Sequence, residues 1–275
     1  MIILLIVLLF SSSLFGMSEP PFFTVAINTA AATGNLAQLK ELITKHGKEL
    51  DRENAAVALW CALNKNQFET AEFLTTSCVD VNVCFSEYET LLEKMSRTKT
   101  VSEVRWLLEH GADPDFCSKG NITRLAQLCE VGDLENAYDI TLQEMELLCM
   151  YGADPNASTG LEMRCLHSLI QKPLRNRFEM IALLISAGAN IHTPRNDGIT
   201  PLHIACYKGM NPIAAYLLNK GAKKDVKNKL GLTPLGYVKF NPDLYAMLAT
   251  DILPPMPVEA LEAEKELNKL KIKLA

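Results

Sequence analysis

The stretch Thr200-Pro201-Leu202-His203-Ile204-Ala205 carries the clearest pattern in this chain of 275 residues. Threonine is a good residue to begin a helix, because its hydroxyl accepts a backbone N–H that has no partner within the helix. Proline suits the first helical position, where its missing N–H costs nothing. Leu202 and Ala205 are three residues apart, so they face the same side of a helix. The stretch therefore predicts a short helix with one buried face.

A second helix is predicted directly downstream. Gly209 allows a tight turn, and an apolar stripe follows at Ala214, Leu217 and Leu218. Gly221 then stands where a left-handed helix end is expected. Two short helices cannot bury such a stripe alone, so the pair predicts neighbours of the same kind stacked on both sides.

The pattern recurs along the chain. Related stretches start at residues 25, 57, 90, 123, 164, 200 and 233, with spacings of 32, 33, 33, 41, 36 and 33 residues. Gly-Ala pairs at residues 111, 152, 188 and 221 close successive units, and the seven residues before the next start are 116–122, 157–163, 193–199 and 226–232. The two longer units carry their extra residues near 132–141 and 171–177, where we expect longer turns or helix ends.

Thr200-Pro201-Leu202-His203 with Gly209 and Gly221-Ala222 resembles the ankyrin repeat, a unit of about 33 residues. The resemblance covers roughly residues 22–250. It implies an all-α solenoid of about seven helix-turn-helix units with finger loops along one edge. It also implies that His167 and His203 hydrogen-bond neighbouring loops, and that other proteins bind across the fingers and the concave face of the first helices.

Composition excludes several other classes of protein. The chain is 48% hydrophobic, which is too apolar for intrinsic disorder. Its net charge of -5 argues against nucleic acid as a partner. Eight cysteines are too few for a disulfide scaffold, and Cys61, Cys129 and Cys206 fall at first-helix positions that suit a small apolar side chain. No catalytic, metal-binding or cofactor-binding motif is present, so we expect no enzyme and no cofactor.

The two ends of the chain differ from the repeats. Residues 1–16 begin with ten apolar residues, which suit the core of a signal peptide and are too few to span a membrane. No basic residue precedes them and Met17 offers a second start. They are therefore either an export or anchoring segment or a start-codon artefact. Residues 251–275 begin with a Pro-rich break and continue as a predicted amphipathic helix.

Variable finger positions are the candidate partner-binding residues: Phe116, Ser118, Lys119, Ser158, Thr159, Arg195, Asn196, Lys227 and Lys229. The densest basic run comprises Lys220, Lys223, Lys224, Lys227 and Lys229. It predicts an acidic partner segment, whereas a solvated loop edge is the simpler interpretation.

These observations favour a non-catalytic scaffold or adaptor that binds another protein, as a cytoplasmic monomer with no membrane contact beyond the N-terminal segment. The alternative is a secreted effector of an intracellular bacterium that acts on host proteins. The apolar N-terminus favours it, and so does the glutamate-rich tail, which looks like a type IV secretion signal. A capping helix explains that tail equally well. An accessory region of an enzyme is a third and weaker hypothesis.

Overall fold

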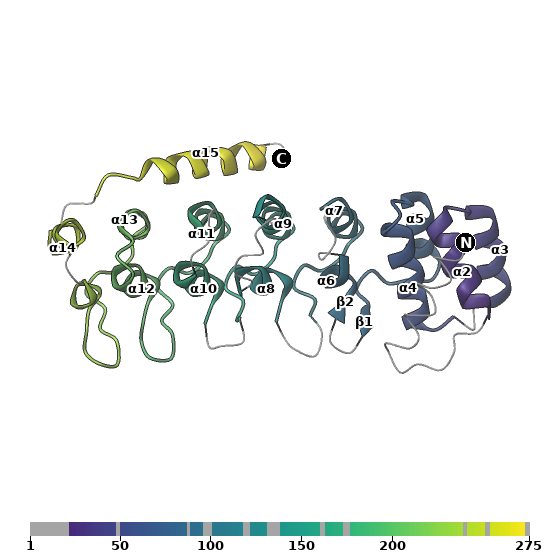
Figure 1. The fold of residues 1–275 in the computed structure, drawn as a ribbon, viewed down its shortest axis with the longest axis horizontal. Coiled ribbons are helices and arrows are strands. Elements are labelled where there is room, and N and C mark those ends of the chain that lie inside the picture. Colours follow the sequence, from purple (N-terminus) through teal and green to yellow (C-terminus); the bar gives the residue numbers. More distant parts are fainter. Residues whose placement is uncertain are drawn as a thin grey trace. The chain divides into compact units, whose positions relative to one another are not determined.

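The computed structural model describes residues 22–47, 50–86, 89–95, 101–117, 122–130, 138–159, 163–172, 177–238, 241–250 and 254–272. These residues fall in two compact units, Met1–Ala112 and Asp113–Ala275. Their regular secondary structure is almost entirely helical, as the sequence predicts, and each of the seven predicted repeats contains a pair of helices (Figure 1). Residues 1–16 lie outside the described part of the chain.

The first unit contains three helix pairs. The first helices of these pairs, α2, α4 and α6, pack on one another in order. A short antiparallel pair of strands, β1 and β2, precedes α6. The elements are α2 Phe22–Thr33, α3 Leu36–His46, α4 Arg52–Leu63, α5 Phe68–Ser77, β1 Cys84–Ser86, β2 Glu89–Thr90, α6 Leu91–Met95 and α7 Ser102–Glu109.

The second unit contains four pairs and one further helix. The first helices α8, α10, α12 and η1 pack in order, and second helices also pack together, α9 on α11 and α13 on α14. The elements are α8 Arg124–Glu130, α9 Tyr138–Met150, α10 Cys165–Gln171, α11 Arg177–Ser186, α12 Pro201–Tyr207, α13 Asn211–Asn219, η1 Pro234–Tyr237, α14 Pro242–Ala249 and α15 Val258–Ile272.

The seventh repeat departs from the predicted pattern. Its first helix is a 3-10 turn of four residues, η1, although Thr233 and Pro234 stand where the other helices begin. Gly236 occupies the position of His203 in the preceding repeat. Glycine is a poor helix former and supplies no side chain to cap the turn. This substitution accounts for the short element.

Apolar and small side chains fill the core between the helices. Leu202 is 1% exposed and Ala205 is fully buried, which confirms the predicted inner face of α12. Cys129, Cys165 and Cys206 are buried, and all eight cysteines are free thiols. Burial raises the pKa of the Cys206 thiol to about 12, so this side chain packs as a small neutral group.

A recurring turn ends the second helices. Gly111, Gly152, Gly188 and Gly221 have φ between 88° and 102°, a left-handed conformation that favours glycine. The alanine after each glycine donates its N–H to a leucine carbonyl five residues earlier, at 2.8 to 2.9 Å. Val79 donates to Leu74 in the same way at 3.0 Å. The second repeat therefore closes with this bond even though Cys78 replaces the glycine.

Hydrogen bonds from polar side chains link successive closing turns. The Asp115 carboxylate accepts the N–H of Asp154 at 2.9 Å. Asn156 repeats the bond one unit later, because its Oδ1 accepts the N–H of Asn190 at 2.7 Å. The Asn156 amide also donates to the Gly188 carbonyl at 3.3 Å. These bonds join neighbouring repeats at the base of the fingers.

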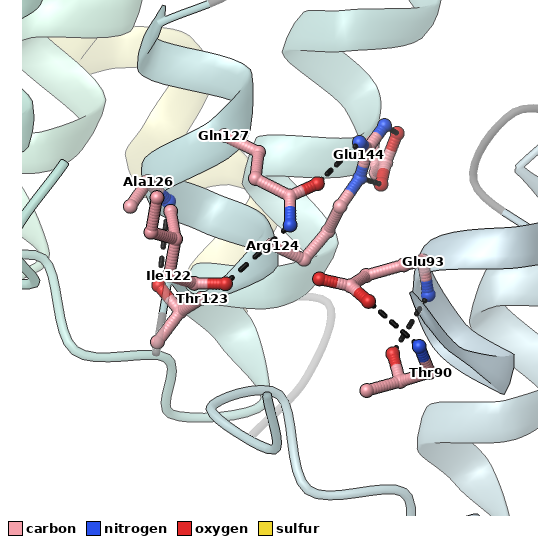
Figure 2. Close-up of polar contacts among 8 residues, drawn as sticks. All are labelled: Thr90, Glu93, Ile122, Thr123, Arg124, Ala126, Gln127 and Glu144. Atoms are coloured by element: carbon pink, nitrogen blue, oxygen red, sulfur yellow. Dashed lines mark hydrogen bonds and ion pairs between the residues drawn. The ribbon is translucent and has the colours of Figure 1, made fainter. Parts of the chain in front are cut away.

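Two variations of the capping pattern occur in the middle of the chain, one in each unit (Figure 2). In the first unit the Thr90 N–H donates to Glu93 Oε2 at 2.7 Å, and the Glu93 N–H donates to Thr90 Oγ1 at 3.1 Å. In the second unit Arg124 begins α8 where Pro201 begins α12. Its Nε and Nη2 donate to the buried Glu144 carboxylate at 2.8 and 3.3 Å. This ion pair ties α8 to α9.

The C-terminal segment forms the predicted helix but adds no further pair to the stack. After Pro254 and Pro255 the chain turns back, and α15 packs against α11 (Figure 1). Within the described ranges no helix is both long enough and apolar enough to cross a membrane.

Leu202→Ala should lower the free energy of unfolding by about 2 to 5 kcal/mol, because it leaves a cavity between α12 and its neighbours. Leu230, which is 78% exposed, offers a matched control. Leu230→Ala should change the stability by less than about 0.5 kcal/mol. Denaturant unfolding followed by circular dichroism measures both, and equal effects would contradict the assignment of the buried face.

Candidate protein-interaction surface

Three finger loops in the second unit share one backbone hydrogen bond across their base. Thr159 donates to the Met163 carbonyl at 3.0 Å, Arg195 to Ile199 at 2.9 Å, and Asn228 to Leu232 at 2.9 Å. These three donors therefore occupy one equivalent position. The described residues on either side of it are exposed, namely Ser158, Pro194, Asn196, Lys227 and Lys229. The finger thus alternates between an inward position and outward positions.

The structure divides the predicted partner-binding residues into four groups. Ser158, Asn196, Lys227 and Lys229 are exposed, and Phe116 and Arg195 are half-buried. Ser118 and Lys119 lie outside the described residues. Thr159 is only 1% exposed, and both its N–H and its hydroxyl donate to the Met163 carbonyl. The prediction of Thr159 as a contact residue is therefore wrong, because it stands at the inward position of its finger.

Asn228 organises the last finger and was not singled out from the sequence. Its side chain is buried, and its Oδ1 accepts the N–H groups of Leu230 and Leu232 at 2.9 and 3.0 Å. Its amide donates to the Tyr237 hydroxyl at 2.7 Å. The sequence signal for this role is an asparagine, Asn228, between two lysines of a loop. The side chain of asparagine commonly accepts the backbone N–H two residues further on.

Backbone atoms also join this finger to the one before it. The Lys229 N–H donates to the Asp197 carbonyl at 2.9 Å. Gly198 lies against the same backbone with φ of 81°, and a Cβ at this position would stand 2.9 Å from the Asn228 Cα atom. Glycine is therefore required at residue 198 by its conformation and by the close approach of the next finger.

His203 connects its helix to the following finger. Its Nδ1 accepts the N–H of Thr200 at 3.2 Å and faces the Thr200 hydroxyl at 2.8 Å. Because Nδ1 is an acceptor, the proton of the neutral ring lies on Nε2, which donates to the Leu232 carbonyl at 3.1 Å. This contact matches the role that the repeat pattern implies for His203.

His167 caps the start of α10 in the corresponding way. The Arg164 N–H approaches its Nδ1 at 3.4 Å. Burial, and after it the Arg195 guanidinium, lower the pKa of this imidazole from 6.5 to about 4, while backbone groups of Thr193 and Ile199 act in the opposite sense. The ring is therefore neutral in the folded chain at neutral pH.

The predicted basic run does not act as one surface. The Lys220 ammonium pairs with Glu264 of α15 at 2.6 Å, and the Lys224 ammonium donates to the Thr250 carbonyl at 2.6 Å. Lys223, Lys227 and Lys229 are exposed. Arg195, one repeat earlier, pairs with Asp197 at 3.2 Å. The charge available to a partner is thus smaller than the sequence indicates.

Exposed apolar side chains accompany these lysines. Tyr207 at the end of α12 is 59% exposed, and its ring meets that of Tyr237 edge to face at 6.1 Å. Leu230 and Leu232 are exposed on the same finger as Lys229. Tyrosine is enriched where proteins bind one another, because it offers apolar area together with a hydroxyl. We call Tyr207, Leu230, Leu232 and Tyr237 the aromatic patch.

Catalysis or metal binding gains no support from the geometry. Across the described residues, no group of three or more His, Cys, Asp or Glu side chains could hold a metal ion. His167 and His203 are occupied by capping contacts rather than placed beside a nucleophile. What this region offers is an exposed set of finger side chains on a backbone with fixed hydrogen bonds.

Comparisons with known proteins agree with this architecture. Residues 137–228 match the family model for ankyrin repeats in three copies. Over 69 residues the chain is 42% identical to mouse protein phosphatase 1 regulatory subunit 27, which is 25% of this chain and 45% of that protein. It is 27% identical over 218 residues to human ankyrin repeat and SOCS box protein 16, covering 77% of this chain and 46% of that protein. The chain thus spans less than half the length of each relative.

A solved structure shows the same fold over most of the chain. The ankyrin repeat domain of Bcl-3, described as a unique member of the IkappaB protein family, superposes with a TM-score of 0.63 at 21% identity. The match covers 82% of this chain and 98% of that one. At this level of identity the likeness concerns the fold alone.

Gly198→Ala should destabilise the chain more than Gly231→Ala. Both glycines have positive φ, but only Gly198 has the neighbouring finger within contact distance of a new Cβ. We expect about 1 kcal/mol from the strained φ in each variant and roughly 1 to 2 kcal/mol more at Gly198 from the steric clash. Denaturant unfolding measures the difference, and hydrogen exchange should show a less protected Lys229 amide only in Gly198→Ala. Equal losses would contradict the contact between the fingers.

The neutral His167 ring should make stability depend on pH. Because its folded pKa of about 4 lies below the ordinary value of 6.5, its contribution is complete above pH 6.5 and is lost as the pH falls towards 4. We expect a loss of about 2 to 3 kcal/mol over this range. His167→Gln should flatten the slope in denaturation curves recorded between pH 7.5 and 4. An unchanged slope would assign the acid sensitivity to other groups.

Proposed function

Because residues 137–228 match the ankyrin-repeat family model, we propose that this chain is a non-catalytic binding module whose partner is another protein. The partner lies across the fingers and first helices of the last three repeats. The observation that carries this proposal is the exposure of Lys227, Lys229, Leu230 and Leu232 on a finger whose backbone is held by Asn228, together with the exposed Tyr207 of the aromatic patch. Such a finger presents its side chains without a large ordering cost on binding.

The chemistry of this surface favours a partner segment that is acidic and carries at least one apolar side chain. Lys227 and Lys229 are exposed on the finger and Lys208 follows the exposed Tyr207, while Asp225 is the exposed acidic residue in the same finger. The apolar side chain would contact the aromatic patch, and carboxylates of the partner would meet the lysines. Exposed lysines mainly guide the encounter, whereas buried aromatic contacts supply most of the affinity.

The relatives support a role that depends on another protein. One of them carries the name of a regulatory subunit of a phosphatase, and another combines ankyrin repeats with a SOCS box. The chain covers 45% and 46% of these proteins, so their partners are not transferred to it. What supports the proposal is the general property that fingers on a repeat scaffold vary while the core is kept.

Lys227→Glu combined with Lys229→Glu should slow association with the partner by about tenfold at low salt. The effect should shrink as salt rises, because exposed charges are screened beyond about 8 Å at physiological ionic strength. Quantitative affinity capture with the full chain identifies the partner, and surface plasmon resonance at two salt concentrations then measures its association rate.

A matched double variant controls for the change in net charge. Lys45 in α3 and Lys65 after α4 are exposed in the first unit and belong to no finger loop of the second. Lys45→Glu with Lys65→Glu should leave the association rate close to that of the wild type. Equal slowing in both double variants would show that the effect comes from net charge alone. No slowing in either variant would show that the partner is recognised elsewhere on the chain.

A further inference from the structure

Helix α15 occupies the face of the second unit that the second helices form. It packs against α11 and runs back along the stack from α13 (Figure 1). Ala260 is fully buried and Ala263 is nearly so, whereas the larger Val258 and Leu261 are exposed. The buried face of α15 therefore presents small residues at positions i and i+3, which allow two helices to approach closely.

One glutamate marks the position of α15 on this face. Glu264 Oε1 accepts a hydrogen bond from the Tyr216 hydroxyl at 3.1 Å and pairs with the Lys220 ammonium at 2.6 Å. The same ammonium lies 5.5 Å from the centre of the Tyr216 ring. Burial raises the pKa of Tyr216, so its hydroxyl stays protonated and available as a donor. Tyr216 of α13 and Lys220, which directly follows this helix, thus converge on a single carboxylate.

Separate contacts hold the segment that leads into α15. The Asn219 amide donates to the Pro254 carbonyl at 2.8 Å, and Lys224 donates to the Thr250 carbonyl at 2.6 Å. Neither contact involves a residue of α15 itself. The acceptors are backbone carbonyls of the segment, so these hydrogen bonds do not depend on the sequence of α15.

We propose that the outer face of α11 and α13 is a helix-binding site, which α15 fills in cis and which also accepts a partner helix of the same chemistry. The partner helix presents small residues at i and i+3 and a glutamate at i+4, as Ala260, Ala263 and Glu264 do. Tyr216 and Lys220 recognise the carboxylate, and the small residues allow close packing on α11. The site lies on the second helices and is distinct from the finger surface.

The tethered helix competes strongly with any partner. A short linker gives α15 an effective concentration of the order of mM at its own site. A helix in trans therefore binds measurably only when the fit of α15 is weakened. Weakening α15 without changing α11 or α13 is thus the direct way to expose the site.

The test measures binding of a fluorescent synthetic peptide of residues 254–272 to the full chain by anisotropy. Glu264→Lys places a second ammonium against Lys220 and should release α15, so this chain should bind the peptide at least about tenfold more tightly than the wild type does. Glu262→Lys makes the same charge change at an exposed position of α15 and serves as the matched control. It should bind the peptide no better than the wild type.

A charge exchange then tests the recognition itself. The single substitution Lys220→Glu places a second carboxylate against Glu264 and should likewise release α15, but this chain should bind a peptide that carries Glu264→Lys and not the wild-type peptide. Equal binding of the wild-type peptide to the wild-type, Glu264→Lys and Glu262→Lys chains, or binding that ignores residue 220, would overturn the proposal. So would the absence of binding to any chain. These outcomes involve only this chain and its own peptide, so they leave the proposal about the finger surface untouched.

Discussion

No helix pair in this chain can bury its apolar face by itself, and the rest of the structure follows from that constraint. A pair of short helices gains enough buried area only when neighbours stack on both sides. Stacking at a fixed spacing in turn requires that each unit end in the same way. The left-handed glycines, the alanine-to-leucine hydrogen bonds and the side-chain links through Asp115 and Asn156 meet this requirement. The fingers lie on top of this regular base.

Much of the fold could be predicted because its determinants are local. A threonine, a proline and a leucine in sequence fix the start of a helix, and a Gly-Ala pair fixes its closing turn. The closing turn at Cys78-Val79 escaped prediction because the backbone N–H of any residue can form its hydrogen bond. Glycine only lowers the conformational cost of the turn. The first helix of the seventh repeat is shorter than predicted for a related reason. Thr233 and Pro234 mark the start of a helix that does not continue past Gly236 as a regular α-helix.

The candidate site was predicted less well because its properties depend on distant residues. Thr159, chosen as a contact residue, stands at the inward position of its finger, which only the bond to Met163 reveals. Lys220 and Lys224 were grouped with Lys227 by proximity in sequence. Their actual partners, Glu264 and Thr250, come from a segment that returns after the repeats end. Nothing within the repeat pattern indicates where that segment lies.

The hydrogen bond between Lys229 and Asp197 has a consequence for how such a surface can evolve. It uses an N–H and a carbonyl, which nearly every amino acid supplies. Substitutions at residues 197 and 229 therefore change what the fingers offer to a partner while the connection between them persists. Gly198 is the exception, because the close approach leaves no room for a Cβ. Selection for a new partner can act on the exposed residues separately from selection for folding.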